Sequence, residues 1–144
     1  MTLAILGVLA SITVPIVQVT QQREKERELK KALFEIRSAI DAYKHASDEG
    51  RITKSIGETG YPPNLQVLVD GVIDVRNPTR KKMYFLRHIP INPMIKNADN
   101  DPANTWGKRS YASEANDPKE GDDIYDVYVP SQQIGLNGIA YRNW

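Results

Sequence analysis

The sequence contains no cysteine. Disulfide bonds, thiol catalysis and cysteine-ligated metal sites are therefore excluded for these 144 residues. Histidine is nearly as scarce, because His45 and His88 are the only two, and neither stands in a pattern with a catalytic partner. The nucleophile motif of serine hydrolases, the His-Glu motif of zinc proteases and phosphate-binding glycine loops are also missing. We therefore expect that the protein is not an enzyme, and we assign no catalytic residue.

A surplus of charge of one sign is missing as well. Lys and Arg number 19 and Asp and Glu number 18, so the formal net charge is +1. Proteins that bind nucleic acids neutralise phosphates with a basic surplus, and this composition gives no reason to expect such a partner. Aromatic residues make up 8% of the chain, and we expect Trp106 and Trp144 to pack in the core and rim of a small head.

The most informative segment that is present carries no charge. Met1–Val17 is uncharged, and a charged, amphipathic stretch follows it without a turn signal. We expect one helix from about Leu3 to Ser47, about 65 Å long at 1.5 Å per residue. Residues 1–22 are interpreted as a hydrophobic anchor, because their apolar run is close to the length of about 20 residues that spans a bilayer. They lack the basic start and the small-residue cleavage site of a signal peptide. The anchor residues are Leu3, Ile5, Leu6, Leu9, Ile12, Val14, Pro15 and Ile16.

The second half of this helix, residues 23–49, has one apolar face. Its members recur every three or four residues and are predicted to pack against the head: Leu29, Leu33, Ile36, Ile40 and Tyr43. We expect the opposite charges Glu26 and Lys30, and likewise Arg37 and Asp41, to pair on the solvated side, since they lie four residues apart.

Two local signals modify the predicted helix. Pro15 lacks an N–H and crowds the carbonyl of Ser11, so we expect a kink or a locally unwound turn there. Asp48-Glu49-Gly50 is the predicted stop, because glycine readily takes the left-handed cap conformation.

Residues 50–144 are predicted to form a globular head of α+β class. Prolines at 62 and 63 precede a short helix near Leu65–Val69. Arg109–Ser113 and Ile124–Val129 read as strands, with a polar loop from Glu114 to Asp123 between them. The expected fold is thus a long N-terminal helix, apolar and then amphipathic, packed on a small antiparallel sheet.

Acidic residues in two loops raise the question of a cation. Asn97, Asp99 and Asp101 alternate as in a calcium loop, but Pro102 stands at the glycine position and no glutamate closes the loop. A second group could gather oxygens around an ion: Asp117, Glu120, Asp122 and Asp123. We interpret both groups as solvated turns, because Asp and Asn are common in turns for backbone reasons alone. We assign no metal ligand and no cofactor, and keep calcium as an open alternative.

Several segments resemble one known family. The anchor LAILGVLASITVP, followed by a charged amphipathic helix and a small head, is similar to type IV pilin-like proteins. Within that superfamily, YPPNLQVLV, YFLRHIPINPM, TWG, YDVYVPS and GLNGIAYRNW resemble the major pseudopilin of bacterial type II secretion. The resemblance covers nearly the whole chain.

The resemblance implies a structural role. Such a subunit is held by its anchor in the bacterial inner membrane, with its head in the periplasm, until copies polymerise into a helical filament whose core is made of the anchors. The implied partners are other copies of the chain, the lipid bilayer before assembly, minor pseudopilins, an inner-membrane assembly platform and exported proteins. No nucleic acid is implied. The assembled filament would be periplasmic or extracellular.

The chain departs from the family pattern in two places. The family's leader, its glycine cleavage point, the following phenylalanine and a nearby glutamate have no counterpart, and we expect that the start was assigned late or trimmed. The family's C-terminal calcium loop corresponds to Gln132–Asn143, which contains no aspartate. The resemblance therefore transfers no metal site.

Two alternatives to the secretion filament remain. One is a surface pilus subunit for adhesion, motility or electron transfer; Phe34 and Tyr43 are the only aromatic residues of the rod, which is a thin basis for conduction. The other is a single-pass, membrane-anchored domain that binds a ligand or partner as a monomer.

Overall fold

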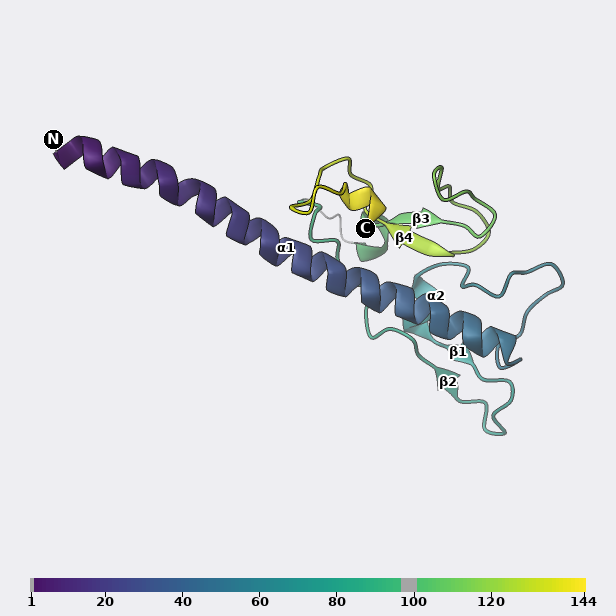
Figure 1. Ribbon diagram of the computed structural model, residues 1–144. Helices are drawn as coiled ribbons and strands as arrows, with labels where there is room; N and C mark the ends of the chain where they lie inside the picture. The colour runs from purple at the N-terminus through teal and green to yellow at the C-terminus, as the bar shows by residue number, and fades with distance from the viewer. Residues whose placement is uncertain (1, 97–100) are drawn as a thin grey trace.

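The computed structural model describes the backbone of residues 2–96 and 101–144 and the side chains of residues 15–96 and 101–144. One long helix dominates the molecule, and a small head packs against its second half (Figure 1). The elements in chain order are α1 (Thr2–Asp48), α2 (Gln66–Asp70), β1 (Val72–Ile73), β2 (Lys82–Met83), the 3₁₀ helix η1 (Pro102–Thr105), β3 (Gly107–Arg109), β4 (Asp126–Tyr128) and the 3₁₀ helix η2 (Tyr141–Asn143). β1 pairs with β2 and β3 pairs with β4, both antiparallel, so the fold is α+β.

The end of α1 follows the predicted stop. The helix ends at Asp48, and Gly50 takes the left-handed conformation with φ of 73°. The N–H of Arg51 donates to the carbonyl of Ala46 at 3.0 Å, and the N–H of Gly50 donates to the carbonyl of Ser47 at 3.0 Å. This pair of bonds is a Schellman motif, which satisfies two carbonyls that the helix end would otherwise leave unpaired.

The locally unwound turn, one of the two outcomes expected at Pro15, is absent from the described backbone. α1 remains helical from Thr2 through Pro15 to Asp48, and Figure 1 shows one continuous rod. The prediction of a locally unwound turn was wrong. A proline removes only one helical hydrogen bond, and the turns on both sides hold the remaining backbone in place.

The core of the head forms around one face of α1. Five side chains of this face are 0–7% exposed: Leu29, Leu33, Ile36, Ile40 and Tyr43. They join buried residues that come from every part of the head, among them Leu68 of α2, Trp106, Val127 of β4 and Tyr141 of η2. Each fully buried Leu or Ile contributes about 1.5–3 kcal/mol relative to an exposed one. The hydrophobic face of α1 therefore provides much of the stability of the head.

α2 lies one residue later than predicted. The structure has a helix at Gln66–Asp70 after the two prolines. The side-chain Oδ1 of Asn64 accepts from the backbone N–H of Val67 at 2.9 Å, which satisfies one of the unpaired donors at the helix start.

The strands are shorter than predicted, and β4 lies at Asp126–Tyr128, within the expected Ile124–Val129. β3 spans Gly107–Arg109, so it begins two residues before the predicted start and ends at Arg109. Its central residue Lys108 pairs with Val127 of β4. Ser110 and Tyr111 leave the ladder because their N–H groups donate to the carbonyl of Lys119 and to the carboxylate of Asp123. The predicted strand at Arg109–Ser113 was therefore mostly wrong.

The hairpin of β1 and β2 was not predicted at all. Val72 pairs with Met83 and Ile73 with Lys82, and two residues per strand are too few to produce a visible alternation. The head thus contains two small sheets in its described part, where one was expected.

An ion pair fastens the β1–β2 hairpin to the end of α1. The guanidinium of Arg51 donates to the carboxylate of Asp74 from Nη2 at 2.8 Å and from Nε at 3.1 Å. Asp74 is buried, and its carboxylate also accepts from the N–H of Arg76. Arg51, followed by this backbone hydrogen bond, holds the pKa of Asp74 below its usual value.

We expect this ion pair to make folding sensitive to acid. Because the folded-state pKa of Asp74 is lowered, the pair stabilises the fold above the ordinary aspartate pKa of about 3.9. That stabilisation is lost as the pH falls below this value and through the folded pKa. Asp74→Asn should therefore lower the urea midpoint at pH 7 and reduce the further drop between pH 5 and pH 3. Asp70→Asn, at an exposed position, is the control, and an unchanged acid drop in Asp74→Asn would contradict the assignment.

A second prediction concerns the buried face of α1. Ile36 is fully buried, whereas Phe34, two residues away on the same helix, is 73% exposed. Ile36→Ala should lower the free energy of unfolding by about 2–5 kcal/mol, since it leaves a cavity in the core. Phe34→Ala should change it by less than about 0.5 kcal/mol. Urea unfolding followed by circular dichroism measures both, and equal effects would show that the wrong face was assigned to the core.

Candidate assembly surface along α1

The stem of the molecule is the part of α1 before Gln22, where contacts with the head begin. Its described residues, 15–21, are all exposed, and Ile16 and Val17 are 60% and 49% exposed. The hydroxyl of Thr20 donates to the carbonyl of Ile16 at 2.9 Å, so this polar group is satisfied within the helix. Figure 1 shows the stem extending well beyond the head. The structure therefore presents apolar side chains on a helix that nothing in the described chain covers.

Six of the predicted anchor residues have side chains outside the described set. They are Leu3, Ile5, Leu6, Leu9, Ile12 and Val14, whose backbone is helical. Pro15 and Ile16 are described and exposed. Within the described residues, no helix is both long enough and apolar enough to cross a bilayer.

The C-terminal segment, residues 129–144 after β4, binds α1 at the point where the stem leaves the head. The carboxylate of Glu26 accepts from the hydroxyl of Tyr141 at 2.8 Å and from the N–H of Leu136 at 2.8 Å. The side-chain amide of Gln22 donates to both Glu26 and the Tyr141 hydroxyl. Burial raises the pKa of the Tyr141 hydroxyl, which therefore stays protonated and donates to Glu26. The prediction that Glu26 pairs with Lys30 in solvent was wrong, since Glu26 is buried at 8% exposure.

Arg37 connects α1 to β4 and makes the second connection to the C-terminal segment. Its Nε donates to the carboxylate of Asp126 at 2.8 Å, and its Nη2 donates to the carbonyl oxygens of Val127 and Trp144 at 3.1 and 2.9 Å. The predicted partner was Asp41. Helical spacing places Asp41 within reach, but the head supplies three acceptors that match the planar guanidinium better.

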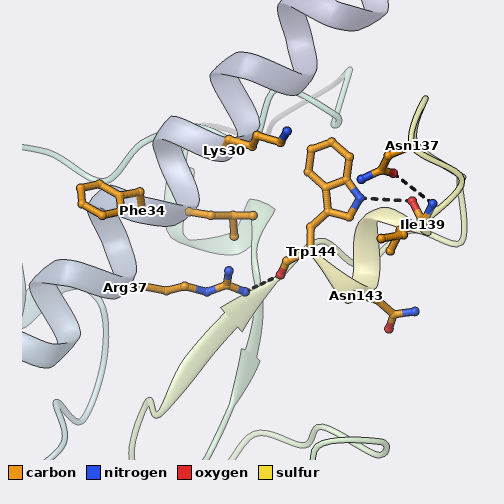
Figure 2. Close-up of a pocket in the computed structure, with 8 residues that line it drawn as sticks. Lys30, Phe34, Arg37, Asn137, Ile139, Asn143 and Trp144 are labelled. Carbon is orange, nitrogen blue, oxygen red and sulfur yellow. Dashed lines mark hydrogen bonds between the residues drawn. The ribbon is translucent and has the colours of Figure 1, made fainter.

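An open groove lies between α1 and the C-terminal segment, with a volume of about 390 Å³ (Figure 2). Phe34 forms one side, and the indole of Trp144 and Ile139 form the other. The ammonium of Lys30 lies 5.1 Å from the centre of the Trp144 ring, a cation–π arrangement. The indole N–H donates to the carbonyl of Ile139 at 3.1 Å, which fixes the ring. The groove offers fixed aromatic and aliphatic surface with a cationic edge, and its lining holds neither a carboxylate nor a histidine.

A larger, polar cavity of about 820 Å³ lies at the other end of the head, between residues 52–63 and 110–123. Near it, Tyr61, Tyr111 and Tyr125 pack together with ring centres 5.0–5.7 Å apart, and Lys44 lies over Tyr61 at 5.4 Å. This tyrosine cluster was not predicted, because its members are spread over 65 residues of sequence.

The acidic residues of the 114–123 loop have separate partners. Asp123 is buried and accepts from the hydroxyl of Thr59 and the N–H of Tyr111, while Asp117 pairs with Lys119 at 3.1 Å. Among the described residues no group of three or more acidic or histidine side chains could hold a metal ion. Asn97 and Asp99, the start of the other predicted loop, lie outside the described residues.

The described residues therefore offer exposed apolar and aromatic surfaces along α1. The exposed stem, the groove and the two connections of the C-terminal segment all lie along α1. No protein-family model, curated protein or solved structure matches the chain. The fold itself defines an α+β protein with a protruding N-terminal helix.

A substitution at Glu26 tests the connection to the C-terminal segment. Glu26→Ala leaves the Leu136 N–H and the Tyr141 hydroxyl without their acceptor, which should cost about 1–3 kcal/mol of unfolding free energy. Amide hydrogen exchange at Leu136 should become faster. Glu28→Ala, at an exposed position of the same helix, should change neither quantity. Unchanged exchange at Leu136 in Glu26→Ala would contradict the assignment.

Proposed function

We propose that this protein is a pilin-like structural subunit that polymerises into a helical filament serving type II protein secretion. The single observation that carries the proposal is the continuity of α1. The helix runs without interruption from the head into an exposed stem, and no residue before Arg23 carries a charged side chain. The proposed role in secretion rests on the segments of the sequence that resemble the major pseudopilin of type II secretion.

The physical argument starts from the uncovered stem. Residues 2–22 span about 30 Å as a helix, which is close to the thickness of the hydrocarbon core of a bilayer. Ile16, Val17 and Val19 are exposed on this helix. Contact with water is costly for such a surface, by roughly 25 cal/mol per Å². Lipid would cover the stem before assembly, and the stems of neighbouring copies would cover it in the filament.

The head would project from the core of such a filament. α1 buries one face in its own head, while residues outside that face remain exposed, including several charged residues and Phe34. In this arrangement the protein performs no bond chemistry. Before assembly, the stem lies in the inner membrane and the head in the periplasm. An assembly platform with minor pseudopilins would add the subunit to the growing filament. The filament would move exported proteins.

Hydrophobic attraction alone does not explain the transfer from lipid to filament. Lipid tails and apolar side chains are similarly nonpolar, so stems gain little by exchanging one for the other. Close packing of the stems and contacts between heads must supply the difference. The heads therefore need complementary surfaces.

Electron microscopy tests the proposal. The full chain is purified in detergent, and the detergent is then removed. We expect helical filaments, since dispersed monomers would expose the stem to water. Ile16→Asp should reduce filament formation by at least about tenfold, because burying a carboxylate in an apolar core is strongly unfavourable.

Two measurements make this test specific. Gln21→Asp places the same charge in the stem at an already polar position and should be much milder. The melting temperature of the head should stay the same in both variants, since both positions are exposed. A stable monomer in detergent-free buffer would overturn the proposal and favour a monomeric binding domain.

A further inference from the structure

The charges of the head are segregated into two exposed sets. Between Val75 and Ile95 the chain carries five basic residues and no acidic one. All five are exposed, and we call them the basic face: Arg76, Arg80, Lys81, Lys82 and Arg87. Within the described residues none of them forms an ion pair with a carboxylate; Arg76 and Lys82 donate to the backbone carbonyls of Glu49 and Asp70 instead.

The opposite charge is concentrated in the loop between β3 and β4. Between Ala112 and Ile124 the chain carries five acidic residues and one lysine. Four of the acids are exposed and form what we call the acidic loop: Glu114, Asp117, Glu120 and Asp122. Asp117 pairs with Lys119 at 3.1 Å, and Glu120 lies 4.0 Å from Lys108. Glu114 and Asp122 have no cationic partner among the described residues.

The two sets lie at the same height along α1. Phe85, between the members of the basic face, packs against Tyr43 with ring centres 5.5 Å apart. On the other side, Lys44 donates to the carbonyl of Thr59, and Thr59 in turn donates to Asp123 of the 114–123 loop. Figure 1 shows the β1–β2 hairpin on one side of α1 and the β3–β4 loop on the other.

We propose that the basic face of one copy docks on the acidic loop of the next copy. This inference rests on the proposed function and names the contact between heads that it requires. Because the two surfaces are different parts of the head, the contact is heterologous. A docked pair keeps one free surface of each sign, the acidic loop of one copy and the basic face of the other. Heterologous contacts produce open chains or rings, whereas two-fold contacts stop at a dimer. The geometry is the one that a filament needs.

Both surfaces also have the composition of protein interfaces. Exposed Tyr84 and Ile73 accompany the basic face, and exposed Tyr111 lies next to the acidic loop. Interface cores are enriched in tyrosine and apolar groups, and opposite charges at the edge steer association and fix its orientation. A second copy therefore satisfies both the charged and the apolar part of each surface.

An anionic membrane or a polyanion fits the basic face less well than the acidic loop of a second copy. The level of Tyr43 lies about 30 Å along α1 from the end of the stem at Gln22. Screening in physiological salt reduces electrostatic attraction over about 8 Å, so the membrane that would hold the stem lies out of range of the basic face. A polyanion would neutralise the basic face but would leave the acidic loop without a partner.

Cysteine cross-linking tests the contact, since the chain has no cysteine of its own. Lys81→Cys and Glu120→Cys are prepared as separate full-length proteins and treated with a short bifunctional maleimide. We expect the mixture to give cross-linked dimers, and each protein alone to give none. A chain that carries both substitutions should give a ladder of oligomers. Dimers from either protein alone would overturn the heterologous contact, and so would a mixture that gives no cross-link at high protein concentration.

Charge exchange provides an independent test by filament formation. The Lys81→Glu/Lys82→Glu variant and the Glu120→Lys/Asp122→Lys variant should each raise the critical concentration at least about tenfold, because like charges then face each other. The combination of all four substitutions should restore it to within about threefold of the wild type. Lys96→Glu, at an exposed position that belongs to neither set, is the control and should have little effect.

The outcomes separate this inference from the proposed function. If the wild type forms filaments and the charge exchanges leave the critical concentration unchanged, the contact is wrong and the filament stands. If the wild type forms no filament, the proposed function fails, and cross-linking of the mixture still decides the contact. Binding to anionic phosphatidylglycerol vesicles that requires Lys81 and Lys82, without any cross-link between copies, would overturn the contact in favour of a membrane.

Discussion

The burial of a single face of α1 determines the rest of the structure. Leu29, Ile36 and Ile40 are fully buried, and the head is assembled around them from short pieces that could not form a core on their own. Strands of two or three residues have little independent stability. They are held in place because Val127, Leu68 and Tyr141 reach the same helix face. The opposite face and the stem, freed from any role in the core, remain available for other molecules.

Sequence patterns located α1 well, because its signal repeats over many turns. The apolar spacing from Leu29 to Tyr43 and the glycine at position 50 are local features, and the helix ends where they indicate. The partners of the charged residues on α1 could not be predicted from local spacing. Glu26 and Arg37 have suitable partners four residues away, and helical spacing alone favours those pairs. Their observed partners, Tyr141 and Asp126, are about 90 to 115 residues distant, and no local pattern reports such a contact.

The sheets of the head were hard to predict for a related reason. β1 and β2 are too short for an alternation of polar and apolar residues, and the predicted extension of β3 is replaced by bonds from Ser110 and Tyr111 to the loop that follows. The groove beside Phe34 could not be predicted either, because its two sides come from distant parts of the sequence. Lys30, Ile139 and Trp144 come together only because the C-terminal segment folds back on α1. A helical residue such as Phe34 can be recognised as apolar from the sequence, but its neighbours cannot.

The two connections between the C-terminal segment and α1 have a mechanical consequence. Glu26 and Arg37 are eleven residues apart, which is about three helical turns, so both project from the same side of the helix. Glu26 accepts hydrogen bonds from Leu136 and Tyr141 of the C-terminal segment. Arg37 donates to Trp144 of that segment and to Asp126 and Val127 of β4. A force applied to the exposed part of α1 would therefore be transmitted to the head, because the polar contacts of Glu26 and Arg37 hold helix and head together at two points about three turns apart.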